Sequence, residues 1–352
     1  MAVTMGDVAK LAGVSTKTVS NYYNDYPYMR EDTRRRIESA IAELDYRMNV
    51  AARNLRSGRT GMIMLAIGEL DQAYLAELAQ SVIRVAEDLG LGVLVETTGG
   101  RRDREIEVLE GSRGRNVDGV IYEPLELGPE DVERHHTGFP LVLMGERVLD
   151  GAVDHVTLPN EAGARAAVDH LVSLGRRSIA LIGTDAANPS RGAALRRKGY
   201  LDALAAGGIE PRDALMIGPR RWHRPEGAAA MDRLLDSGER VDAVFALNDA
   251  LALGAMRAIL RRGLRVPEDI AVVGFDDTED ARFSTPSLTT VSPGRDALAR
   301  AAVLALHRRI TESGYVPGKD PIVAGFDLVV RESTGGPAET AETARTAETA
   351  GH

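Results

Sequence analysis

Three polar side chains near the N-terminus, Thr16, Lys17 and Asn21, have the chemistry needed to read DNA bases. A lysine can donate to O6 or N7 of guanine, and an asparagine can form two hydrogen bonds with adenine. Each good bidentate pair contributes about 1 to 3 kcal/mol of discrimination against the wrong base. The three residues lie within two helical turns of one another, so the sequence predicts one short helix that directs them outward.

Two short helical patterns, joined by a tight turn within residues 3–24, must position these side chains. Thr4 can cap the first helix while Asp7, three residues on, hydrogen-bonds back to the cap. Gly13 suits the turn because it has no Cβ, and Ser15 can cap the second helix. This pattern is typical of a helix-turn-helix. A purely structural helical hairpin is the alternative, but the polar outer side of the second helix favours DNA reading.

A small three-helix core is expected to hold the two helices together. Val8 and Leu11 lie on one face of the first helix, and Val19 of the second helix points back at them. A third helix begins near Asp32 and repeats apolar residues at the spacing that buries one stripe. These residues are Ile37, Ala40, Ile41 and Leu44.

The segment from Thr4 to Ser20 resembles the N-terminus of the LacI/GalR family of bacterial transcription regulators. Its residues satisfy every defined position of the phrase T-x-x-D-V-A-x-x-A-G-V-S-x-x-T-V-S. The resemblance implies that the helix from Ser15 enters the major groove and that Thr16, Lys17 and Asn21 select bases. The DNA-binding residues that the resemblance implies are Thr4, Ser15, Thr16, Lys17, Thr18, Ser20, Asn21 and Asn24, followed by Asn49, Ala52 and Leu55.

Residues 47–58 can form about two turns of helix, which is too short to be stable alone in water. Asn49 can cap this segment, Ala52 and Leu55 belong to its small apolar face, and Met48 stands where the family usually has proline. The resemblance implies a hinge helix that pairs with its copy in a dimer and lies in the minor groove. Leu55 then wedges between base steps and kinks the duplex. An ordinary linker, with Leu55 packed on the body, is the alternative.

Composition separates a basic head from an acidic body. The 352 residues carry a formal net charge of −9, yet residues 1–60 carry ten Lys or Arg against seven Asp or Glu. Basic side chains of the head are therefore candidates for phosphate contacts. No apolar run long enough to span a membrane, no signal segment and no cysteine are found, so a cytoplasmic protein with no membrane partner is expected.

From Met62 onward, apolar strand-like runs alternate with amphipathic helices, which predicts parallel sheets in two α/β lobes. The resemblance implies an N-terminal, lambda-repressor-like head followed by a periplasmic-binding-protein-like body of two Rossmann-like lobes. The first lobe covers about 61–158 and 295–322, and the second about 159–291 and 323–332. A ligand sits between them near the carboxyl ends of strands. We expect a head at 1–60, a body at 61–332 and a disordered tail at 333–352, because the tail lacks apolar bulk.

Four body residues match the positions that line the family's effector cleft: Arg196, Trp222, Asn248 and Asp276. Their carboxylate, guanidinium, amide and indole groups suit a polyhydroxylated ligand, so a sugar is the leading expectation. The first lobe adds Gln72, Tyr74 and Arg147. Each of the four also has a structural alternative. Asp276 could bond the next turn, Asn248 could cap the helix that reaches Leu260, Arg196 could be solvated, and Trp222 could be packing.

Catalysis, a cofactor and a metal are not predicted. Hydrolase, zinc-protease and Walker motifs are missing, and Gly90-Leu91-Gly92 lacks the third glycine of a dinucleotide fingerprint. The adjacent His135 and His136 would point to different faces of a helix. The prediction is a homodimeric repressor that binds a pseudo-palindromic operator and responds to a small molecule. A sugar-binding α/β protein with structural N-terminal helices is the alternative. Operator, effector, sign of the response and tetramer formation stay open.

Overall fold

The computed structural model describes residues 3–23, 26–46, 59–111, 117–128, 130–131, 138–146, 153–184, 191–219, 221–318 and 320–337. By its internal contacts the chain divides into two compact units, Met1–Thr60 and Gly61–His352. We call these the head and the body. The predictions made for Asn24, Asn49, Ala52, Leu55 and Arg147, and for most of the tail, fall outside the described residues.

The described residues of the head form three helices, α1 (Met5–Ala12), α2 (Thr16–Tyr23) and α3 (Glu31–Glu43). The predicted capping box is confirmed: Thr4 Oγ1 accepts from the Asp7 amide at 3.3 Å, and Asp7 Oδ2 accepts from the Thr4 amide at 2.9 Å. Gly13 has φ of 65°, a conformation that suits glycine because it has no Cβ. Ser15 Oγ accepts from the Thr18 amide at 3.1 Å, so α2 begins where its cap predicts.

The core of the head differs from expectation at one residue. Val8, Val19 and Ile37 are fully buried, but Leu11 is 46% exposed, so its predicted place in the core was wrong. Ala9 and Ala12 are buried instead. At 100° per residue, the stripe shared by Val8, Ala9 and Ala12 leaves Leu11 on the flank of α1. Ile41 and Leu44 pack against this core and are partly buried.

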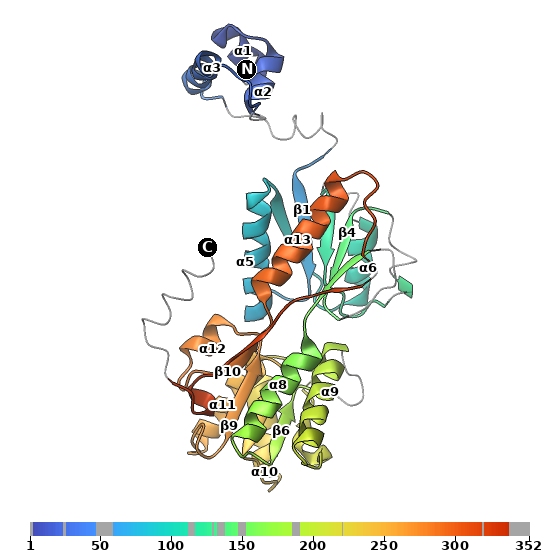
Figure 1. Cartoon of the computed structure of the whole chain (residues 1–352), viewed down its shortest axis with the longest axis vertical. Coiled ribbons are helices and arrows are strands. Elements are labelled where there is room, and N and C mark those ends of the chain that lie inside the picture. The colour runs from blue at the N-terminus through green and yellow to red at the C-terminus, as the bar shows by residue number, and fades with distance from the viewer. Residues whose placement is uncertain are drawn as a thin grey trace. The chain divides into compact units, whose positions relative to one another are not determined.

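The first lobe of the body is a six-stranded parallel sheet in the order β11-β5-β4-β3-β1-β2. Helices α5 and α13 lie side by side on one face of this sheet, as Figure 1 shows. The strands are β1 (Met62–Ile67), β2 (Gly92–Thr97), β3 (Gly119–Tyr122), β4 (Leu141–Met144), β5 (Asp154–Thr157) and β11 (Ile322–Val323). Among the described residues of this lobe, the helices include α5 (Ala73–Asp88), α6 (Arg102–Gly111) and α13 (Arg295–Thr311).

The second lobe repeats this plan in the order β12-β10-β9-β8-β6-β7, with only β12 antiparallel to its neighbour. Its strands are β6 (Ile179–Ile182), β7 (Met216–Ile217), β8 (Ala243–Ala246), β9 (Ala271–Phe275), β10 (Thr289–Ser292) and β12 (Asp327–Val329). Its helices are α8 (Asn160–Ser173), α9 (Arg191–Ala206), α10 (Arg224–Asp236), α11 (Asp249–Arg261) and α12 (Glu279–Phe283), with 3₁₀ turns at Asp213–Leu215 and Glu332–Thr334.

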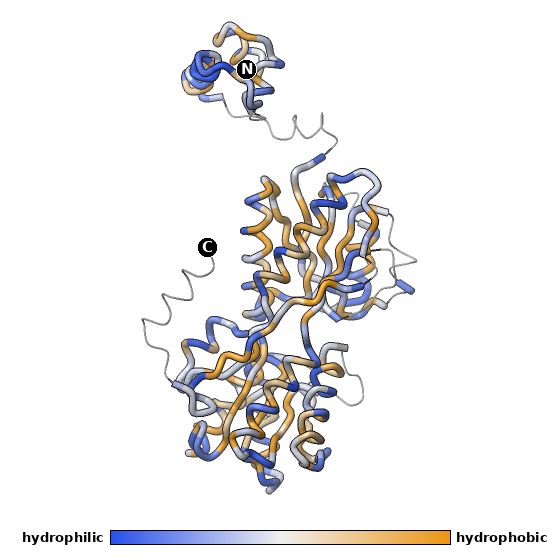
Figure 2. Tube along the Cα trace, viewed as in Figure 1, coloured by the Kyte–Doolittle hydropathy of each residue, from blue (hydrophilic) through white to orange (hydrophobic). Residues whose placement is uncertain are grey.

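The chain passes between the lobes three times, after β5, after β10 and after β11. In each sheet the strand order reverses beside the first strand, β1 in one lobe and β6 in the other. Ligands of open α/β sheets bind outside the carboxyl ends of strands at such reversals. Central strands such as β1, β3, β4, β8 and β9 are hydrophobic, whereas the helices carry both hydrophobic and hydrophilic residues (Figure 2). The predicted fold class, a helical head and a two-lobed α/β body, is confirmed.

Helices α10 and α11 approach closely because two glycines face the partner backbone. A Cβ built on Gly227 would lie 2.2 Å from the Leu251 carbonyl oxygen, and one on Gly254 would lie 2.0 Å from the Arg224 carbonyl oxygen. Neither contact can be relieved by a rotamer change, since the opposing atoms are main chain. This packing fixes the position of α10 against α11, and both helix starts border the cleft.

We expect Gly254→Ala to lower the free energy of unfolding by about 3 kcal/mol, because overpacking against backbone forces the two helices apart. Urea unfolding followed by circular dichroism measures this change. Gly128→Ala is the control, since a Cβ there meets nothing within 4 Å, and its effect should stay below about 1 kcal/mol. Equal stabilities of the two variants would contradict close glycine-mediated packing.

Candidate ligand-binding cleft and DNA-reading helix

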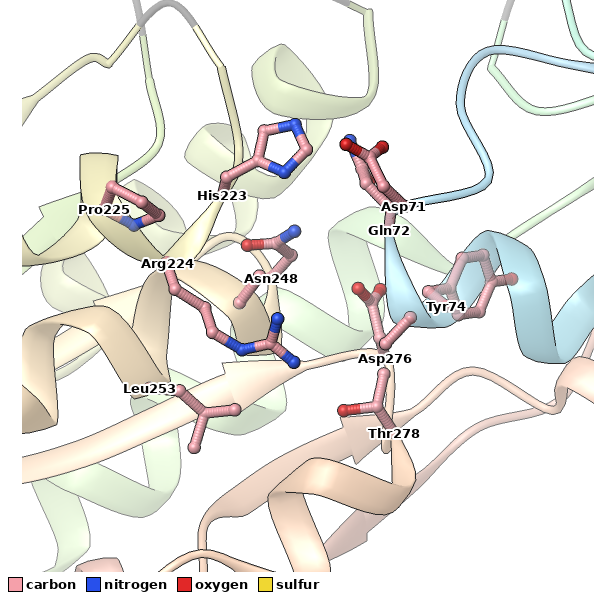
Figure 3. A pocket seen from close by; sticks show the side chains of 12 residues that line it. Asp71, Gln72, Tyr74, His223, Arg224, Pro225, Asn248, Leu253, Asp276 and Thr278 are labelled. Carbon is pink, nitrogen blue, oxygen red and sulfur yellow. The ribbon is translucent and has the colours of Figure 1, made fainter. Parts of the chain in front are cut away.

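A cavity of about 330 Å³ lies between the lobes. Figure 3 shows the Asp276 carboxylate and the Asn248 amide between the loop that bears Asp71 and Gln72 and the segment that bears His223 and Arg224. Four of the predicted ligand residues, Gln72, Tyr74, Asn248 and Asp276, line this cavity. The other lining residues are Asp71, Ala73, His223, Arg224, Pro225, Ala250, Leu253 and Thr278.

Asp276 follows strand β9 on a strained turn. Its φ is 124° and that of Asp277 is 52°, values that cost of order 1 to 3 kcal/mol each in residues other than glycine. The turn is held from both sides: the Asp276 amide donates to the Val291 carbonyl at 2.8 Å, and Asp277 Oδ1 accepts from Arg331 at 2.8 Å. These contacts hold the turn in its strained conformation. The turn directs the Asp276 carboxylate toward the cavity.

Asp249 stabilises the same turn through buried hydrogen bonds, a role that the sequence did not indicate. Its carboxylate is fully buried and accepts from the Thr290 hydroxyl at 2.5 Å and the Thr278 amide at 2.8 Å. Burial raises the pKa of Asp249 to about 7, although these hydrogen bonds oppose the shift. Asp249 is a positioning residue, because it holds Thr278 in place at the cavity wall.

Arg196 is bound by the protein itself and sits behind the cavity wall. Its Nε donates to Asn160 Oδ1 at 2.6 Å, and a terminal nitrogen donates to the Leu247 carbonyl. The guanidinium lies 3.6 Å from the centre of the Phe275 ring and 3.8 Å from Asp276 Oδ1. Burial lowers the pKa of Arg196 and raises that of Asp276, and each charge opposes the other's shift. Only 6% of Arg196 is exposed, so the solvated alternative was wrong.

Trp222 and Asn248 are also engaged with the protein. The Trp222 indole N–H donates to the Gly183 carbonyl at 3.0 Å. Its ring packs against the buried hydrophobic clusters on both faces of the second lobe's sheet. Asn248 Oδ1 accepts from the Leu251 amide at 2.9 Å, so the alternative that Asn248 caps α11 is confirmed. Its amide nitrogen donates to the Trp222 carbonyl at 3.1 Å. Asn248 lines the cavity as well, whereas Trp222 supports it from behind.

Three side chains of the first lobe each have a buried oxygen atom with no hydrogen-bond partner within the described part of the chain. These are the Tyr74 hydroxyl, Glu123 Oε2 and Glu146 Oε1. The other Glu146 oxygen accepts from Thr157 at 2.9 Å. Burial, followed by repulsion from Glu146 and Glu105, raises the pKa of Glu123 to about 7. Burial also raises the pKa of Tyr74, with Asp276 and Glu123 adding to the shift. The sequence did not indicate Glu123 or Glu146, because each is a single acid at a strand end.

Charged side chains bridge the two lobes at the edge of the cleft. Glu69 of the first lobe accepts from Arg221 at 3.0 Å and pairs with His223 at 2.9 Å, both in the second lobe. Glu77 of α5 accepts from the Glu279 amide at 3.0 Å across the gap, and Arg295 pairs with Glu77 at 2.7 Å. These contacts are side-chain ion pairs and hydrogen bonds that can be exchanged for water, so they leave the cleft able to open.

On the head, helix α2 presents its predicted reading residues to solvent. Thr16 and Lys17 are exposed, and Thr18, Ser20 and Asn21 are partly exposed. The Ser15 and Thr18 hydroxyls lie 2.8 Å apart, and Thr4 Oγ1 lies 2.7 Å from Asp7 Oδ2. Ser15 and Thr4 are therefore engaged in helix caps. Thr16, Lys17 and Asn21 keep side chains that can reach a groove.

A head with a solvent-facing helix-turn-helix, followed by a two-lobed body with a polar cleft, defines a ligand-responsive DNA-binding protein. Comparison with known families agrees. Residues 4–49 match the model of bacterial regulatory proteins of the lacI family, and residues 168–334 match a periplasmic binding protein-like domain. Among the described residues, no helix is long and apolar enough to cross a membrane.

Three solved structures resemble the chain over most of its length. A LacI-family transcriptional regulator from Sanguibacter keddieii is 50% identical, with a TM-score of 0.73 over 79% of this chain and 100% of that one. The complex of the regulator CelR with cellobiose is 31% identical, with 0.70 over 94% and 99%. The Lac repressor dimer, bound to operator and the anti-inducer ONPF, is 30% identical, with 0.76 over 95% and 99%. The chain belongs to the lacI family of bacterial transcription regulators.

We expect the stability of the body to fall as pH rises from about 4.5 to 7. Burial raises the pKa of Glu123 from 4.5 to about 7, so the folded state retains a proton that the unfolded chain releases. Glu123→Gln should remove this part of the pH dependence and should raise stability by roughly 1 to 3 kcal/mol at pH 7.5.

Urea unfolding at a series of pH values measures the effect. The matched control is Glu87→Gln, at an exposed position on α5 of the same lobe, and should leave the pH dependence unchanged. A Glu123→Gln variant that keeps the wild-type slope would show that Glu123 is not the titrating group.

Proposed function

We propose that this regulator is a repressor whose affinity for its operator is set by a sugar bound in the cleft. The observation that carries the proposal is the Asp276 carboxylate, aimed by a strained turn at a cavity lined from both lobes. A carboxylate accepts from sugar hydroxyls, and the Asn248 amide and Gln72 add further polar partners. The CelR–cellobiose complex, which shares the fold, supports a sugar as the ligand. We assign the chain no catalytic role.

Binding and release are linked through the two lobes. A ligand that contacts Asp276 in one lobe and Tyr74 in the other favours one relative orientation of the lobes over another. The proposed reporter of that orientation is the segment 47–58, which lies outside the described residues and for which the sequence predicts a helix that needs a partner, here DNA, to form. A coupling of about 1 to 3 kcal/mol is typical for such linked sites.

The proposed assembly is a homodimer, which places two heads at a spacing matched to a pseudo-palindromic operator. The Lac repressor dimer on its operator supports this arrangement. Exposed apolar side chains of the second lobe provide surface for it: Phe283 on α12 is 73% exposed, and Leu260 on α11 is 42% exposed. We place the protein in the cytoplasm, where bacterial DNA is accessible.

Selection of genomic fragments by the full chain, repeated with a panel of sugars at constant salt, tests the proposal. We expect specific fragments to be retained and one sugar class to change their retention. The alternative, a sugar-binding protein with structural N-terminal helices, predicts sugar binding without specific or salt-dependent DNA binding. Failure to retain specific fragments under any condition would refute the repressor proposal.

We expect Asp276→Ala to abolish the sugar response while leaving DNA affinity without sugar close to wild type. The reason is that Asp276 faces the cavity of the body, whereas DNA is read by the head. Electrophoretic mobility shift with and without the sugar measures both quantities. Asp236→Ala, at an exposed ion pair on α10, is the control and should respond normally. A retained response would mean that Asp276 serves only the fold.

We expect Asn21→Ala to weaken binding to a selected operator by about 5- to 100-fold, with little change on random DNA, because base contacts provide specificity. Competition binding at two salt concentrations measures both affinities. Arg35→Ala, at an exposed residue of α3, is the control, and any loss it causes should be similar on both DNAs. Equal losses by Asn21→Ala on operator and random DNA would remove Asn21 from the reading set.

A further inference from the structure

We propose that Glu69, Asp71 and His223 form a site for a divalent transition-metal ion, Zn²⁺ above all, at the mouth of the cleft. One ligand atom from each residue lies within 4.8 Å of the other two, and His223 Nε2 lies 2.9 Å from Glu69 Oε2. Glu69 and Asp71 belong to the loop after β1 in the first lobe, and His223 precedes α10 in the second. The site therefore spans both lobes.

The donor set suits zinc. Zinc is bound by imidazole nitrogen and carboxylate oxygen at about 2.0 to 2.2 Å, and tetrahedral geometry then places neighbouring donor atoms roughly 3.3 Å apart. The 2.9 Å between His223 Nε2 and Glu69 Oε2 needs to widen slightly, and the exposed Asp71 carboxylate, within 4.8 Å of both residues' ligand atoms, completes the set by rotating its side chain. An imidazole beside two carboxylates also disfavours Mg²⁺ and Ca²⁺, which prefer oxygen donors alone. Figure 3 shows the Asp71 carboxylate and the His223 ring facing each other across the gap.

The neighbouring arginine is compatible with a bound ion. Arg221 contacts Glu69 Oε1 at 3.0 Å, whereas His223 pairs with the other oxygen, Oε2. Arg221 can therefore keep its hydrogen bond and orient the carboxylate while Oε2 binds the metal. Arg221 is 57% exposed, so solvent screens its repulsion of the ion. Two carboxylates against this one arginine leave negative charge that a cation would balance.

Three protein ligands leave a fourth position open to water or to a ligand hydroxyl. Asp71 and His223 also line the 330 Å³ cavity, so that position faces the proposed sugar site. Because both lobes contribute ligands, the ion binds only when they approach each other, and it stabilises that closed arrangement. Binding of the metal ion does not depend on the proposed function. An effect of the bound ion on DNA affinity rests on the proposed function.

Calorimetric titration of the untagged, chelator-treated full chain with ZnCl₂ tests the site. We expect one Zn²⁺ per chain with a micromolar or lower Kd, and no comparable binding of MgCl₂. Tryptophan fluorescence provides a second readout, because Trp222 is the only tryptophan in the sequence and precedes His223 directly. His223→Asn, Glu69→Gln and Asp71→Asn should each raise the Kd at least tenfold, and circular dichroism checks that each variant folds.

His307→Asn on α13 is the matched control and should bind zinc as the wild type does. Asp276→Ala, which should remove the sugar response, should also retain zinc binding. Absence of a single zinc equivalent, or unchanged affinity in His223→Asn, would overturn the metal site and leave the repressor proposal intact. Zinc binding by a chain that retains no specific DNA would support the metal site while the proposed function failed.

Discussion

The pairing of a buried Asp276 with a buried Arg196 is the constraint on which the cleft depends. A carboxylate and a guanidinium that are each only 6% exposed would be costly to bury apart, so each stabilises the other's charge. Arg196 is held in turn by Asn160, the first residue of α8. The strained turn at Asp276 is fastened to Asp249 through Thr278. The cavity wall is therefore a connected polar network in which the loss of one member leaves another unpaired.

The first lobe meets this network with a different kind of chemistry. It offers hydroxyl and carboxylate oxygens, at Tyr74, Glu123 and Glu146, that lack partners in the described residues. Unpaired buried acceptors are costly unless something donates to them. Tyr74 lines the cavity itself, and a ligand rich in hydroxyl groups also meets the Asp276 carboxylate and the Asn248 amide there, which is the physical reason that a sugar suits the cleft. The ion pairs at its edge involve side chains alone, so closing and opening do not disturb either hydrophobic core.

Much of the fold is predictable because it is local. The buried strands β1, β3, β4, β8 and β9 read as short apolar runs, and the capping box and the α11 cap follow from neighbouring residues. The short polar strands β5 (Asp-His-Val-Thr) and β10 (Thr-Thr-Val-Ser) escaped prediction, because their neighbours in the sheet bury them. The burial of Leu11 was wrongly predicted for a related reason. Spacing identifies the apolar face of a helix, but packing against the other helices decides which residues of that face are buried.

The sequence by itself determined the reading helix and its family, because a helix-turn-helix uses contacts between residues only a few positions apart. The sequence also predicted Asp276 and Asn248, which follow strands β9 and β8, as ligand-binding residues, and both line the cavity. Only the tertiary structure decided that Arg196 and Trp222 support the cavity from behind. It also brought Glu69 beside His223, a pair separated by 154 positions. No spacing rule connects residues on two lobes, since their proximity depends on how two sheets and three chain crossings are arranged in space.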